Sequence, residues 1–258
     1  MPSGYSKYRG RDLTAFTFNP LARFGDEFKP LLLFNERVAE ELAEAGHDVT
    51  IILISPQSDR DNSDIKISKK VKAYVVNATI GLSRKEMEEE QKETVFGELS
   101  GLRMMKRFSR QISLITDTCR ATLEHKELIG WLKSQKFDLA FAHMFDVCPI
   151  GLIHAAQIPS IENMDHYSAT VVDYVAYITG IPTIPSYVPP VFMNAVGEMN
   201  FIQRAKSLIG HGLIKFLWKR WIVEPEMDLF RTYISPDFPD ILELAGKCPL
   251  VIQSIPHS

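Results

Sequence analysis

The first part of the chain carries two apolar runs separated by a segment with helical periodicity. Leu13–Phe18 (LTAFTF) predicts a short buried strand, and Val49–Ile54 (VTIILI) is typical of a parallel strand covered on both faces. Between them, apolar residues recur at helical spacing: Leu31, Phe34, Val38, Leu42 and Ala45. Pro30 suits the first turn of that helix, and Gly46 suits the position just after its end. The pattern predicts a strand–helix–strand unit with a right-handed crossover.

The same alternation of strand and helix patterns repeats further along. The expected elements are strands at Val71–Asn77 and Asp138–Phe145 and helices at Leu114–Leu132 and Gly151–Gln157. A helix over Gly81–Gly97 is also expected, because Ser83 and Glu86 have the spacing of a capping box. Strands that alternate with helices predict an α/β fold with a parallel, Rossmann-like sheet, in which the first four strands lie together.

The pattern changes after Pro159. Four prolines fall within nine residues and predict an ordered loop rather than a central strand: Pro182, Pro185, Pro189 and Pro190. A helix is expected over Asn200–Arg231, kinked or interrupted at Pro225, and a last strand begins at Pro249–Ile252. We therefore expect one domain over residues 1–258, with αβα units at about 13–160 and the proline-rich loop and later helices at about 161–258.

Composition narrows the classes of function. The 258 residues carry a net charge of −3, so no global basic field favours nucleic acid. Cys119, Cys148 and Cys248 are scattered, which favours buried thiols over a disulfide framework. Histidines and carboxylates do not cluster at metal-ligand spacing, so neither a metal nor a cofactor is expected. Neither a signal peptide at Met1–Asp12 nor an apolar run long enough to span a bilayer is recognisable.

Several segments together resemble nematode-type UDP-glucuronosyltransferases. They are Ala39–Thr50 (AEELAEAGHDVT), Phe137–Pro159 (FDLAFAHMFDVCPIGLIHAAQIP), Gly180–Val188 (GIPTIPSYV), Met199–Gly212 (MNFIQRAKSLIGHG) and Phe238–Leu250 (FPDILELAGKCPL). No segment is decisive alone, but the order of the set is specific. The resemblance runs from about Asn19 to Leu250.

The resemblance implies the N-terminal, acceptor-binding half of a GT-B glycosyltransferase. Such a half holds a small lipophilic acceptor, while a second domain, expected to be absent here, holds the UDP-sugar. It also implies a detoxifying transferase at the endoplasmic reticulum membrane. The chain alone is expected to be inactive. The alternative is a truncated protein that binds lipophilic ligands or pairs with full-length relatives, so a homo- or hetero-oligomer is a further expectation.

Transfer of a sugar to a hydroxyl needs a base that removes the hydroxyl proton. The family's catalytic histidine would fall near Leu31, but this sequence has no histidine before His47. The family's acidic partner aligns with His143, and Asp146 could serve instead. These two residues are the expected catalytic site, at the carboxyl edge of the sheet near the loop Asn19–Pro30. Alternatively, Asp146 only caps the following helix and His143 is a polar residue at a strand end.

The sequence context of the remaining histidines indicates structural roles. His47 is expected in a helix-to-strand turn, His125 on a solvated helix face, His154 in the core, and His211 at a helix interruption. His166 follows Asp165 in an expected loop, where a triad role is disfavoured because adjacent side chains point apart.

The aromatic and methionine side chains in the later part of the chain have two interpretations: they line an adaptable acceptor pocket, or they belong to ordinary core packing. The expected acceptor-binding residues are Phe192, Met193, Met199 and Phe201. The amphipathic stretch Phe201–Trp221, with its lysines, could also lie at a membrane interface.

Overall fold

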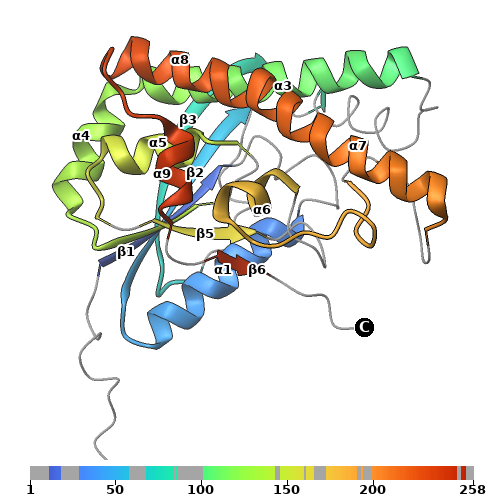
Figure 1. The fold of residues 1–258 in the computed structure, drawn as a ribbon. Helices are drawn as coiled ribbons and strands as arrows, with labels where there is room; N and C mark the ends of the chain where they lie inside the picture. Colours follow the sequence, from blue (N-terminus) through green and yellow to red (C-terminus); the bar gives the residue numbers. More distant parts are fainter. Residues whose placement is uncertain are drawn as a thin grey trace, which may run out of the picture.

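The computed structural model describes residues 12–18, 29–57, 68–83, 85–86, 101–142, 146–159, 161–165, 173–190, 193, 199–248 and 251–253. Its strands are β1 (Asp12–Phe18), β2 (Asp48–Gln57), β3 (Lys72–Leu82), β4 (Leu139–Ala142), β5 (Ile161–Asp165) and β6 (Val251–Gln253). Its helices are α1 (Lys29–Glu44), α3 (Gly101–Glu124), α4 (Lys126–Gln135), α5 (Cys148–Ala155), α6 (Asp173–Thr179), α7 (Phe201–Trp218), α8 (Glu224–Tyr233) and α9 (Ile241–Gly246), with a π-helical turn, Lys219–Val223, between α7 and α8. Figure 1 shows α1 on one side of the sheet and α3, α7 and α8 on the other.

The six strands form one parallel sheet in the order β3-β2-β1-β4-β5-β6. Strand β1 is central, because Leu13 pairs with Val49 on one side and with Leu139 on the other. The prediction that the first four strands share one parallel sheet is confirmed. This strand order is that of the doubly wound Rossmann fold.

Strand β2 is buried on both faces, which explains its continuous apolar sequence. Ile52 and Ile54 belong to the larger core cluster, which is built with α3, α4, α5 and α8. Ile51 and Leu53 point the other way, into a smaller cluster that includes Ala39 of α1. The alternation of side chains along the strand therefore joins the two helical layers through the sheet.

Helix α1 ends as its sequence predicts. Gly46 adopts a φ of 95°, in the left-handed region that glycine enters without a Cβ clash. The His47 N–H donates to the Leu42 carbonyl (3.1 Å) and the Gly46 N–H to the Ala43 carbonyl (3.1 Å). This is the Schellman arrangement, so His47 has the structural role expected of it in the turn before β2.

The capping box is also present. The Ser83 N–H donates to Glu86 Oε2 (2.8 Å), and the Glu86 N–H donates to Ser83 Oγ (3.3 Å). The rest of the predicted helix, up to Gly97, lies outside the described residues.

The long helix predicted over Leu114–Leu132 is two helices, α3 and α4, which meet at His125. His125 leaves the helical ladder, and its Nε2 lies 2.6 Å from the Asn77 carbonyl oxygen of β3. His125 is exposed, as expected, but it also makes a structural contact that the sequence did not predict. Its ring links the helix junction to the sheet.

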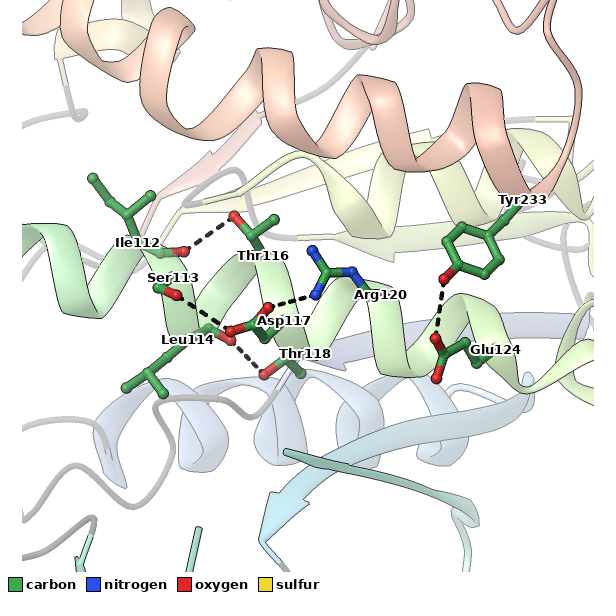
Figure 2. A network of polar contacts seen from close by, with 9 residues as sticks. All are labelled: Ile112, Ser113, Leu114, Thr116, Asp117, Thr118, Arg120, Glu124 and Tyr233. Carbon is green, nitrogen blue, oxygen red and sulfur yellow. Dashed lines mark hydrogen bonds and ion pairs between the residues drawn. The ribbon is translucent and has the colours of Figure 1, made fainter. Parts of the chain in front are cut away.

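Helix α3 is held to α8 at its far end by a polar contact. Figure 2 shows hydroxyl groups that return to the helix backbone, such as Thr118 Oγ1 to the Leu114 carbonyl (2.8 Å). Arg120 pairs with Asp117 (2.9 Å) on the exposed side. At the end of the helix, the Tyr233 hydroxyl of α8 donates to Glu124 (3.0 Å).

The interruption predicted at Pro225 takes the form of the π-helical turn. Pro225 lies in the first turn of α8, where its missing N–H is tolerated. Just before it, the Glu224 N–H donates to the Lys219 carbonyl, five residues back. The chain thus absorbs one extra residue and continues as helix without a break in direction.

Three elements were not predicted: β5, α6 and α9. Strand β5 (IENMD) alternates too briefly to be recognised, and its neighbours β4 and β6 supply the pairing that defines it. The last strand is close to its predicted place, at Val251–Gln253.

The expectation of free buried thiols is wrong for two of the three cysteines. Cys119 of α3 and Cys148 of α5 form a disulfide, with both residues fully buried and their Cα atoms 5.9 Å apart. They lie 29 residues apart in sequence, on helices whose packing the sequence pattern does not reveal. Cys248 has a free thiol and is half-buried.

Among the described helices, none combines the length and the apolar character that a bilayer crossing requires.

Candidate functional site at the carboxyl edge of the sheet

The strand order reverses between β1 and β4. In open parallel sheets, ligands bind beyond the carboxyl ends of the strands at this switch point. Strand β1 ends at Phe18 and β4 ends at Ala142, and the two strands pair through Ala15 and Phe141. The segments that follow them, residues 19–28 and 143–145, lie outside the described residues, and so does the expected catalytic His143. The position near Leu31, where the family's histidine would fall, is in the first turn of α1.

Two buried carboxylates meet the N-terminus of α5, which follows β4. Asp146 and Glu226 have no exposed surface. The Cys148 N–H donates to Asp146 Oδ1 (3.1 Å), and the Val147 N–H donates to Glu226 Oε2 (2.9 Å). Glu226 belongs to α8 and lies 79 residues along the chain from Val147, whose N–H donates to it. The first N–H groups of a helix lack helical partners and carry partial positive charge, so both contacts are favourable.

The remaining oxygens of these carboxylates, Asp146 Oδ2 and Glu226 Oε1, are buried and accept nothing within the part of the chain that the structure describes. Burial raises the pKa of Asp146 to about 7, and the hydrogen bond from Cys148 opposes this rise. Burial raises the pKa of Glu226 well above its usual range, and the nearby Asp146 raises it further. The pair therefore retains a proton near neutral pH, since two buried like charges repel each other.

These contacts give Asp146 the capping role that the sequence offered as an alternative. Its carboxylate is enclosed, with one oxygen bound to the helix terminus, and its charge interacts with the neighbouring Glu226 carboxylate. Proton transfer by His143 or Asp146 stays a prediction. Sequence reasoning did not single out Glu226, although a lone acid among apolar helical positions such as Ile222 and Phe230 could have flagged it.

Two other histidines differ from expectation. His154 was expected in the core, but it is exposed, and its ring meets the edge of Phe238 at 5.4 Å between centroids. His211 was expected to interrupt a helix, but α7 continues through it. His166 lies outside the described residues.

His211 instead helps to bind the proline-rich loop. Its Nε2 lies 2.9 Å from the Val188 carbonyl oxygen, and Ser207 Oγ donates to the Pro185 carbonyl (2.6 Å). Gly210 lies between them, and a Cβ at this position would come within 2.7 Å of Pro190. The inner face of α7 is therefore shaped to receive this loop, which explains the small residue between two polar ones.

The expected acceptor-binding residues do not share one environment. Met199 is 6% exposed and Met193 is half-buried, whereas Phe201 is 86% exposed. Phe192 lies outside the described residues. An acceptor pocket formed by this set stays a prediction.

Comparisons with known proteins identify the family. The family described as "UDP-glucoronosyl and UDP-glucosyl transferase" matches residues 31–240. Among individual relatives, rabbit (Oryctolagus cuniculus) UDP-glucuronosyltransferase 2C1 is 23% identical over 222 residues, which are 83% of this chain and 43% of the relative. A provisionally named UDP-glucuronosyltransferase of Caenorhabditis elegans, ugt-50, is 26% identical over 233 residues, 87% of this chain and 42% of its own length.

A second provisionally named Caenorhabditis elegans relative, ugt-46, is 29% identical over 197 residues, 75% of this chain and 36% of the relative. The chain thus spans less than half the length of the curated relatives that it matches. No solved structure matches it. The profile match covers most of the chain, from the first helix to the start of α9, so the chain belongs to the family of UDP-glucuronosyl and UDP-glucosyl transferases.

Proposed function

We propose that this chain is the acceptor-binding domain of a UDP-glycosyltransferase that conjugates small lipophilic molecules. The family match over residues 31–240 carries the proposal. The Rossmann strand order supports it, because the switch point between β1 and β4 offers a place for a ligand at the carboxyl edge of the sheet. In this proposal, the UDP-sugar is bound by a domain outside these 258 residues, which completes a GT-B arrangement.

The proposed chemistry is proton removal from the acceptor hydroxyl while the sugar is transferred. Histidine suits this step near neutral pH. The segment after β1 holds no histidine before His47, which lies in the turn that leads into β2. His143, the first residue after the described end of β4, is then the proposed base. Asp146 is proposed as a positioning residue, which anchors the start of α5 close to that point.

The alternative function is a binding protein without transferase activity. The absence of a histidine near Leu31 favours it. Such a protein would hold lipophilic ligands, or pair with complete relatives as a homo- or hetero-oligomer.

The disulfide supports a location in an oxidising compartment. Disulfides persist in the secretory pathway and are rare in the cytosol, where thiols are kept reduced. The buried pair Cys119–Cys148 thus agrees with the lumen of the endoplasmic reticulum, the place that the family resemblance implies.

A binding and transfer assay tests the proposal. The purified chain is titrated with a fluorescent phenol and assayed for conjugates with UDP-glucuronate and UDP-glucose. We expect saturable phenol binding without turnover. A general base typically raises the rate ~10²–10⁴-fold, and alignment of the two reactants can remove ~7–11 kcal/mol of the barrier. In this proposal the chain alone lacks the family's histidine near Leu31 and does not hold the UDP-sugar, so both contributions are largely lost. Turnover above a boiled control would contradict the inactivity of the chain alone. No saturable binding in a folded, monodisperse sample would contradict the acceptor role.

A further inference from the structure

Helix α7 turns an apolar face toward solvent. The exposed fractions of its large apolar side chains run from 53% to 86%: Phe201, Ile202, Leu208, Ile209, Leu213 and Phe216. On the opposite side, Ser207, His211 and Trp218 are buried. We call the first group of six residues the outer face of α7. Exposed side chains of this size usually lie singly on a protein surface, so their concentration on one helix indicates a binding surface.

The charged residues in the stretch that carries the outer face, Met199–Val223, are all basic. From Met199 to Val223 the sequence contains no acidic residue and five basic ones: Arg204, Lys206, Lys215, Lys219 and Arg220. With about 100° of rotation per residue, Lys206 and Lys215 fall on the two edges of the outer face. Lys215 Nζ lies 4.4 Å from the ring centroid of Tyr177, an exposed residue of α6.

We propose that the outer face of α7 lies in the interface of an anionic membrane. Its apolar side chains would enter the boundary between headgroups and acyl chains, and the basic side chains at its edges would meet the lipid phosphates. The helix has 18 residues and a length of about 27 Å, and Figure 1 shows it extending past the sheet in line with α8. This inference does not rest on the transferase activity.

The charge pattern favours a membrane over a second copy of the chain. Two copies joined through their outer faces would bring Lys206 and Lys215 of both helices together, and the stretch Met199–Val223 has no acidic residue to offset these four charges. An anionic lipid surface instead attracts each cation, by about 1 kcal/mol for each basic residue near it. A surface that is both apolar and basic is therefore complementary to acidic lipids.

Vesicle flotation tests the proposal. The full chain is floated with vesicles of phosphatidylcholine alone and of phosphatidylcholine with 30% phosphatidylserine. We expect binding to the anionic vesicles that weakens with added salt. The Ile209→Ser/Phe216→Ser variant keeps the charge and should bind about tenfold more weakly. The Lys206→Glu/Lys215→Glu variant should lose about 25-fold in affinity for the anionic vesicles, and much less for the neutral ones.

Matched controls separate this surface from a general charge effect. Lys126→Glu/Lys133→Glu makes the same charge change on exposed positions of α4 and should leave flotation unchanged. The proposal is overturned if the chain does not float with anionic vesicles, or if the control variant weakens binding as much as the α7 variants. It is also overturned if sedimentation shows a dimer that Ile209→Ser/Phe216→Ser dissociates. Phenol binding, measured without vesicles, reports separately on the proposed function.

Discussion

The buried carboxylate pair makes a specific prediction about stability and pH. In the unfolded chain Asp146 loses its proton near its usual pKa of 3.8, whereas in the folded protein it does so at about 7. Between these values the folded state binds more protons than the unfolded state. The free energy of unfolding therefore falls as the pH rises from about 4 to about 7. Glu226, whose pKa is raised further still, acts in the same direction.

The size of the effect follows from the shift. Each pKa unit corresponds to about 1.4 kcal/mol, so a shift of about three units at Asp146 destabilises the protein by about 4 kcal/mol above pH 7, as an upper limit. Glu226→Gln removes one titrating group. Its amide oxygen can still accept from the Val147 N–H, and its neutral side chain no longer adds a charge beside Asp146. We expect the variant to gain about 2 kcal/mol relative to the wild type at pH 8, and little at pH 5.

Urea denaturation at pH 5, 6.5 and 8, followed by circular dichroism, measures these differences. Glu224→Gln is the matched control, because Glu224 lies two residues away and pairs with Arg220 at the surface. Its effect should stay below about 1 kcal/mol and show no dependence on pH in this range. The reasoning is refuted if Glu226→Gln loses stability with rising pH as steeply as the wild type.

Three further predictions concern packing. Gly151→Ala should destabilise the fold by about 2–4 kcal/mol in urea, because its Cβ would lie 2.3 Å from Phe230, whereas Gly130→Ala, in open space, should be neutral or stabilising; equal effects would contradict the packing argument. Cys119→Ala should lower the free energy of unfolding by about 3–4 kcal/mol under oxidising conditions and much less under reducing ones, since the disulfide closes a loop of 29 residues; equal losses would exclude it. Ser207→Ala should lower the free energy of unfolding by about 1–2 kcal/mol and speed proteolysis within the proline-rich loop, because the loop loses its hydrogen bond to α7; an unchanged cleavage rate would show that this bond does not hold the loop.

Local sequence patterns predicted the parts of the fold that local chemistry decides. The β-branched run of β2 required burial on both faces, Gly46 required a left-handed turn, and Pro225 required a change in the helical ladder. Each of these residues restricts its own backbone, so its effect can be predicted without knowledge of the neighbours.

The rest depends on partners that are distant in sequence. His211 lies between two glycines, a pattern that predicts a break in the helix, yet α7 continues through it. Gly210 is instead explained by packing, because a side chain there would collide with Pro190 of the proline-rich loop. The same limit applies at the candidate site. No local pattern tells that Glu226 caps the helix next to Asp146, or that Cys119 meets Cys148. Such pairs become visible only when the sheet brings their helices together.

The π-helical turn before α8 corrects a mismatch of phase between two stretches of sequence. An ideal α-helix advances about 100° per residue, so one surplus residue would swing everything after it by about that angle. Glu226 and Phe230 would then leave the direction set by Ser207 and Trp218. The wide turn at Lys219–Val223 takes up the surplus, and α8 again directs its apolar side toward the core cluster that Trp218 of α7 enters. The length of this junction, counted in single residues, thus sets whether the acid of α8 points at α5 or into water.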